Sequence, residues 1–98
     1  MELEEGSFVI VRYLRKKAPY HFVGKVLQKA AEDENSWLIH YYKCCFDVSS
    51  SHLSFKQPKN PDISATDRES IIKILPKPSF AKGKLCFKTK DIGDLVMH

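Results

Sequence analysis

Tyr13 and Phe22 stand at the two ends of a short polar connection between apolar stretches. Tyr13 ends SFVIVRY at residues 7–13, and Phe22 lies at the start of YHFVGKV at residues 20–26. Aromatic rings on strands usually fill a core, which is one interpretation of the pair. The other is that the two rings face each other across the mouth of a hairpin and hold a ligand between them.

Cysteine and histidine residues offer a different chemistry. Cys44 and Cys45 are adjacent and lack the spacer with which paired cysteines reach one zinc ion, so together with His52 and Cys86 they do not predict a metal site. The chain contains no glycine-rich phosphate loop and no HExxH or GxSxG motif. We therefore expect no enzymatic activity, no catalytic residues and no cofactor.

Basic residues exceed acidic ones. The chain has 16 Lys and Arg against 12 Asp and Glu, and Glu2, Glu4 and Glu5 lie within its first five positions. The remaining residues therefore carry 16 basic against nine acidic side chains. This surplus favours polyanions such as DNA or RNA, although surface lysine also serves solubility. The candidate contacts to nucleic acid are Arg15, Lys16, Lys17, Lys43 and Lys56.

Length and composition predict one small globular domain. The 98 residues are 43% hydrophobic and 29% charged. No apolar run approaches the roughly 20 residues of a membrane-spanning helix, and the acidic start MELEE is unlike a signal peptide. Three cysteines without a disulfide framework suit a reducing compartment. We expect an intracellular monomer that does not contact membranes.

Alternating apolar residues predict strands at residues 7–14, 20–29, 37–43, 52–57 and 71–75. The two prolines in PKNPDISATDRES, residues 58–70, predict a crossover with a turn at SATD rather than a paired strand. GKLCFKTK, residues 83–90, has the composition of one added strand. Short strands with almost no helix indicate an all-β protein, a small five-stranded antiparallel barrel. Its predicted core is Val9, Val11, Val26, Ile39, Ile72 and Ile74.

The order of these stretches resembles a Tudor-like domain, an SH3-like barrel of the Royal superfamily. HFVGKV stands where such domains have an aromatic-x-Ala/Gly-x-Val strand, and WLIHYYKCC where they have Val-x-Phe-x-Asp-Tyr-Gly. With FKQP and IIKILPKP, the order is similar to a domain found in proteins derived from transposable elements. The resemblance covers residues 6–78, which leaves a flexible acidic segment at 1–5 and a C-terminal extension at 79–98.

The resemblance implies a cage that binds a methylated lysine or arginine through the electron-rich faces of aromatic rings. Its four positions correspond to Tyr13, Phe22, Tyr41 and Cys44. Cys44 replaces the usual tyrosine and Lys43 the usual acid, and Tyr42 is a candidate to complete the cage. A lysine at that place repels a cationic ligand, so we predict a protein-interaction surface rather than a strict methyl reader.

The resemblance also implies a biological setting. It predicts a module, embedded in a longer chain, that docks a protein or peptide such as a histone-like tail. The setting would be nuclear, in a chromatin or transposon-related context. Binding of nucleic acid through the basic loop and face is the alternative function.

Overall fold

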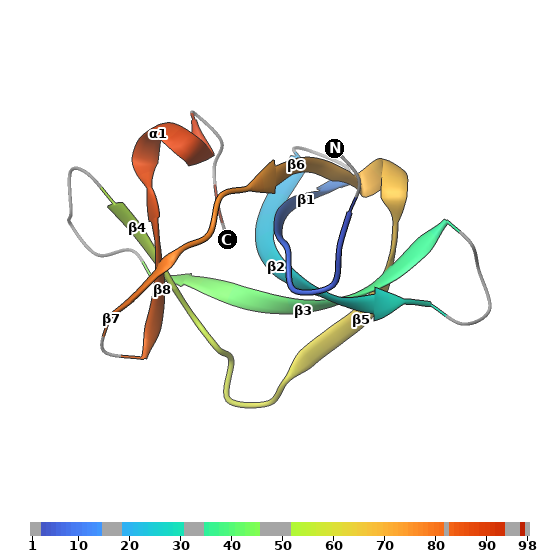
Figure 1. Cartoon of the computed structure of the whole chain (residues 1–98), viewed down its shortest axis with the longest axis horizontal. Helices are drawn as coiled ribbons and strands as arrows, with labels where there is room; N and C mark the ends of the chain where they lie inside the picture. The colour runs from blue at the N-terminus through green and yellow to red at the C-terminus, as the bar shows by residue number, and fades with distance from the viewer. Residues whose placement is uncertain are drawn as a thin grey trace.

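The computed structural model describes residues 3–14, 19–30, 35–45, 52–81, 83–93 and 97, which form mostly antiparallel strands (Figure 1). This confirms the predicted all-β class. The strands are β1 (Phe8–Leu14), β2 (Pro19–Lys29), β3 (Ser36–Cys45), β4 (His52–Lys56), β5 (Asp62–Asp67), β6 (Ile71–Leu75), β7 (Ser79–Ala81) and β8 (Lys84–Lys88). Two short helical turns are η1 (Arg68–Ser70) and α1 (Thr89–Ile92). None of the helices in the described ranges has the length and apolar character needed to span a membrane.

The strands pair in the order β6-β1-β2-β3-β4-β8-β7, and β5 pairs with β3 beside this path. In the described residues no ladder joins β5 to β6, which follow one another through η1. The sheet is therefore not closed as a barrel. Within the described ranges it has eight strands in place of the predicted five.

Strand β3 belongs to two lobes. Its residues 36–41 pair with β5, and its residues 43–45 pair with β4. Figure 1 shows β3 running from one lobe into the other. We call the part built from β1, β2, β5, β6, η1 and the start of β3 the first lobe. The second lobe comprises the end of β3 with β4, β7, β8 and α1.

Residues 8–11 of strand β1 are buried on both faces because two hydrophobic cores lie on its two sides. Val9 and Val11 point into one, and Phe8 and Ile10 point into the other. The first core consists of Leu3, Val9, Val11, Val26, Ile39, Tyr41 and Ile71. The second core consists of Phe8, Ile10, Val23, Cys44, Phe55, Leu75, Leu85, Phe87, Ile92 and Met97.

The segment after residue 78, predicted as an extension, supplies much of the second core. Leu85 and Phe87 come from β8, which lies where the sequence predicted an added strand, and Ile92 comes from α1. Met97 forms an isolated bridge with His21 of β2. The end of the described chain thus covers the outer face of the first lobe.

The predicted core is right at Val9, Val11, Val26 and Ile39, and wrong at Ile72. Ile72 is 36% exposed, whereas Ile71 is buried in the first core. A register shift between β1 and β6 explains the difference, because Val11 pairs with Ile71 whereas Ile10 pairs with Lys73. Ile72 is the extra residue of this bulge and points outward, while Ile74 returns to pack against the first core.

The segment predicted as a crossover contains β5. Pro58 and Pro61 both precede Asp62, so neither interrupts the ladder in which residues 62–67 pair with residues 36–41. The SATD stretch, predicted as a turn, is the end of this strand. As a result β5 occupies the first lobe, and the predicted fourth strand, β4, pairs with β8 in the second.

Candidate functional site

Three of the four predicted cage residues come together at one end of the first core. Phe22 pairs with Val11 across β1 and β2, and Tyr41 pairs with Gly24 across β2 and β3. Tyr13 lies two residues beyond Val11 on the same face of β1, because side chains alternate along a strand. Tyr13, Phe22 and Tyr41, which we call the aromatic triad, therefore project to the same side of the sheet.

The rings of the aromatic triad contact one another. The ring centroids of Tyr13 and Phe22 are 5.6 Å apart, and each lies 6.1 Å from the centroid of Tyr41. Two of the pairs are edge-to-face, at 76° and 79°. These are the separations of packed aromatic pairs, so the rings leave no gap between them for an ammonium group. A ligand has to lie on their outer side.

Hydrogen bonds fix the tyrosines of the triad. The Tyr13 hydroxyl donates to the Tyr41 hydroxyl over 3.0 Å, and Tyr41 also shares a hydrogen bond with the Thr66 hydroxyl of β5. Tyr41 is only 5% exposed. Burial raises the pKa of its hydroxyl above the usual range, more than the Thr66 hydrogen bond lowers it. The Tyr41 side chain is consequently uncharged and held in place by hydrogen bonds at the base of the site.

Two hollows flank the ring of Phe22 and share Phe22, Tyr41 and Asp62. The tyrosine-side hollow, of about 310 Å³, is completed by Tyr13 and Ser64. The lysine-side hollow, of about 320 Å³, is completed by Tyr42, Lys43 and Pro58. An aromatic face and a carboxylate are therefore available to a ligand in both.

Asp62 is the site residue that the sequence did not predict. It lies directly opposite Tyr41 in the ladder between β3 and β5. Its negative charge contributes to the raised pKa of the Tyr41 hydroxyl. The sequence motif has Lys43 where an acid is usual, and here β5 supplies a carboxylate from elsewhere in the chain. If residues 62–67 had been recognised as a strand that pairs with β3, Asp62 could have been predicted beside Tyr41.

Cys44 and Tyr42 point away from the aromatic triad. Cys44 is 4% exposed and lies in the second core, on the opposite face of β3 from Tyr41. The Tyr42 ring packs against Phe8 and His40, with centroid separations of 6.3 and 4.9 Å. Tyr42 nevertheless lines the lysine-side hollow. The fourth cage position, Cys44, is thus not part of the wall around Phe22.

The predicted nucleic-acid contacts divide into two groups. Lys43 and Lys56 are exposed and lie directly opposite each other on β3 and β4. Arg15, Lys16 and Lys17 lie outside the described residues. Cys45 and Cys86 lie on the same face of the second lobe as these two lysines, separated by Ser54. In the part of the chain that the structure describes, no three His, Cys, Asp or Glu side chains are grouped to hold a metal ion.

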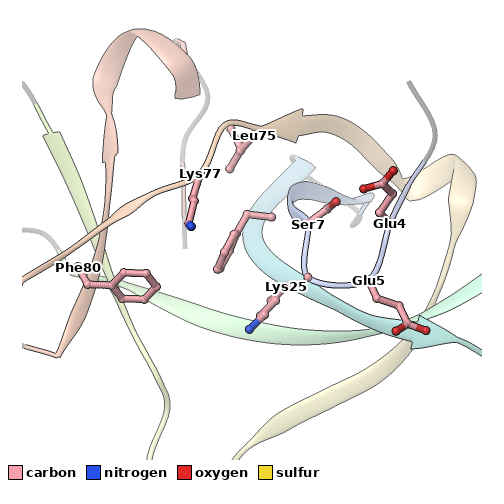
Figure 2. A pocket seen from close by; sticks show the side chains of 9 residues that line it. Glu4, Glu5, Ser7, Lys25, Leu75, Lys77 and Phe80 are labelled. Carbon is pink, nitrogen blue, oxygen red and sulfur yellow. The ribbon is translucent and has the colours of Figure 1, made fainter.

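Figure 2 shows a larger hollow, of about 440 Å³, at the junction of the two lobes. Glu4 and Glu5 line one side, and Lys25 and Lys77 line the side nearer to Phe80. The Lys25 ammonium lies over the Phe8 ring, 5.9 Å from its centroid. Since two carboxylates and two ammonium groups share this hollow, it offers a ligand no net charge.

The hollows at Phe22 and Asp62 are therefore the best candidate for a ligand site, because they combine an aromatic face with an acid on a hydrogen-bonded floor. Such a pair attracts a cation. Neither family models, nor curated protein sequences, nor solved structures give a match to this chain.

Proposed function

We propose that this chain is a non-enzymatic interaction module, Tudor-like in its first lobe, that docks a protein or peptide by a cationic side chain at Phe22 and Asp62. The observation that carries the proposal is the pairing of one aromatic ring with one carboxylate in both adjoining hollows. A ring face attracts a cation by about 0.5–1 kcal/mol at an exposed site, and a nearby carboxylate adds to it.

The Tudor-like part of the proposal is supported by the way in which β1, β2, β3 and β6 supply the first core, with β5 paired to β3 in the same lobe. The aromatic triad lies at one end of that core, at the three aromatic positions that the resemblance assigns to a cage. A nuclear, chromatin or transposon-related setting belongs to the same proposal and rests on the resemblance alone.

The two hollows suit different side chains. Lys43 lines the lysine-side hollow and repels a cation there, whereas the tyrosine-side hollow has Tyr13 and Ser64 instead. The cationic side chain therefore docks on the Tyr13 side of Phe22. A partner with an acidic residue close to its lysine or arginine would also find Lys43 as a charge partner.

Methylation of the partner has little influence on this mode of docking. A methyl reader encloses the cation between several rings, but the rings of the aromatic triad contact one another. The cation therefore contacts one side of the Phe22 ring, and the side of the cation that faces away from the ring stays hydrated. We expect lysine, trimethyl-lysine, arginine and dimethyl-arginine peptides to bind with similar affinities.

Calorimetric titration of these four peptides tests the proposal. Asp62→Asn removes the charge of an exposed side chain and keeps its shape, so it should weaken binding by up to about fivefold, the equivalent of about 1 kcal/mol. Glu69→Gln, an exposed acid on η1, is the matched control and should leave binding unchanged.

Phe22→Ala should also weaken binding by up to about fivefold, because it removes the ring face that attracts the cation. Circular dichroism must show that this variant is still folded, because Phe22 is half-buried against the first core. Absence of binding by all four peptides would refute cation docking. Equal weakening by Asp62→Asn and Glu69→Gln would place the charge effect elsewhere. Strong selection for one methylated peptide would overturn the docking mode but keep the site.

A further inference from the structure

The second lobe has one apolar face and one basic face. Along β4, Phe55 is buried in the second core, while the flanking His52 and Lys56 are exposed. Along β8, Leu85 and Phe87 are buried in the same core, and Lys88 is exposed. We call the outward side the lysine face, and it carries Lys43, Lys56, Lys84, Lys88 and His52.

Three lysines form a row across this face. Lys43 lies directly opposite Lys56, and Lys56 directly opposite Lys84. Residues that face each other across antiparallel strands have Cβ atoms about 4.5–5.5 Å apart, and like charges there are destabilising. The exposed pair Lys43 and Lys56 is therefore unfavourable by itself, and a bound anion would offset that repulsion.

Small side chains separate this row from a second basic row. Cys45, Ser54 and Cys86 lie side by side, two residues along the strands from the three lysines. Ser54 Oγ and Cys86 Sγ are 3.7 Å apart. His52 and Lys88 are paired a further two residues along. At about 3.3 Å per residue the two basic rows lie about 13 Å apart, with a low floor between them.

The lysine face attracts anions because the described strands that form it contain no acid. Residues 43–45, β4, β7 and β8 include four lysines and neither aspartate nor glutamate. At the His52–Lys88 end, a hollow of about 200 Å³ is also lined by Lys77. Asp91 of α1 is the carboxylate among the residues that line this hollow.

We propose that the lysine face binds the phosphate backbone of a nucleic acid. Lys43 also lines the lysine-side hollow, whereas Lys56, Lys84 and Lys88 lie outside both peptide-docking hollows. Between its two rows of ammonium groups, the described part of the face carries only the small side chains of Cys45, Ser54 and Cys86. Binding therefore depends on charge rather than on shape, as in contacts to phosphate backbones that do not read base sequence. The proposal does not depend on the proposed peptide function.

Fluorescence anisotropy with a labelled single-stranded oligonucleotide, and with the matching duplex, tests this site at several salt concentrations. If the four lysines each neutralise a phosphate, the logarithm of the affinity falls with that of salt with a slope of about −3.6 for duplex and about −2.8 for single strands. Duplex binding should weaken roughly 150-fold between about 50 and 200 mM salt. The two arms show which form of nucleic acid is preferred.

The variant Lys56→Gln/Lys88→Gln changes two exposed residues and should reduce the salt slope by about half. Lys29→Gln is the matched control, since Lys29 is exposed and pairs with Trp37 at the far end of β3. Its effect should be small, and all variants should show the same thermal unfolding as the parent chain.

Three outcomes would overturn the proposal. One is absence of binding to both oligonucleotides at low salt. Another is binding that Lys56→Gln/Lys88→Gln and Lys29→Gln weaken equally. The third is binding of a poly-glutamate peptide of matched charge as tightly as either oligonucleotide, which would assign the lysine face to an acidic protein segment. Loss of nucleic-acid binding in the double variant, with peptide binding intact, supports two separate sites.

Discussion

The first and second cores lie on opposite faces of β1 and differ in the side chains that they contain. The first core ends at the aromatic triad, where the Tyr13 and Tyr41 hydroxyls and Thr66 are joined by hydrogen bonds. The second core consists of hydrophobic side chains, such as Phe8, Phe55 and Phe87, in edge-to-face contacts of 5.8 Å. A network of hydrogen-bonded hydroxyl groups therefore lies at the end of the first core that carries the aromatic triad.

This difference separates two tasks. The second core attaches the two lobes to each other and keeps the outer face of β1 from water. The first core holds the aromatic triad in place, so that Phe22 and Asp62 are presented on a fixed surface. Variants should therefore affect stability most in the second core, and affect both stability and docking at the end of the first.

The largest effect is expected from deletion of residues 79–98. This removes Leu85, Phe87, Ile92 and Met97 from the second core and exposes the side of β1 that carries Phe8 and Ile10. We expect the remaining chain to aggregate or to unfold without a cooperative transition, measured by circular dichroism during heating. A monomeric residue 1–78 fragment with a sharp transition would mean that the first lobe is independently stable.

Phe87→Ala tests the second core with the chain length unchanged. Phe87 is 2% exposed and contacts both Phe8 and Phe55, so truncation should lower the free energy of unfolding by about 3–5 kcal/mol. Phe80→Ala is the matched control because Phe80 is 68% exposed, and its effect should stay within about 0.5 kcal/mol. Urea denaturation measures both, and similar losses in the two variants would contradict the burial pattern.

Gly24→Ala tests the first core by overpacking. A Cβ atom at Gly24 would lie 2.2 Å from Cγ2 of Ile39, a β-branched side chain with little freedom to move. The free energy of unfolding should fall by about 1–3 kcal/mol. In a double-mutant cycle, Ile39→Ala removes that methyl group, and the two changes should cost less together than the sum of their separate effects. Additive losses would show that the clash is relieved by other shifts.

The last effect is a fall in the free energy of unfolding that is confined to alkaline pH. Burial holds the pKa of the Tyr41 hydroxyl above its unfolded value of about 10, so the folded state keeps this proton while the unfolded state loses it. The stabilisation is fully present below pH 10 and declines above it by about 1.4 kcal/mol per pH unit. Tyr41→Phe should flatten this decline in denaturation curves recorded at increasing pH. An unchanged slope would mean that Tyr41 does not control the alkaline limit.

The sequence predicted the parts of this structure that depend on local alternation. Val9 and Val11 in β1, and Ile39 in β3, are buried as their period of two indicates. Ile72 was misplaced because a bulge inserts one residue into β6, and a bulge is set by pairing with β1 rather than by the sequence of β6 itself.

The candidate site was predictable only where neighbouring strands form it. Tyr13 and Phe22 come from consecutive strands, whose register follows from their alternation. Asp62 was missed because β5 pairs directly with β3 although β4 lies between them in the sequence. β4 belongs to the second lobe, so this long-range pairing cannot be read from the order of the strands. The resemblance assigned Cys44 to the fourth position of the aromatic cage. Because side chains alternate along β3, Cys44 instead points into the second core.

The double burial of β1 has a consequence for synthesis of the chain. Residues of β1 leave the ribosome long before β8 and α1, whose side chains cover Phe8 and Ile10. Until residues 84–97 have emerged, the nascent first lobe exposes a row of apolar side chains to water and to other chains. The second core is therefore completed only after β8 and α1 have emerged, and chaperones have a defined apolar surface to shield in the interval.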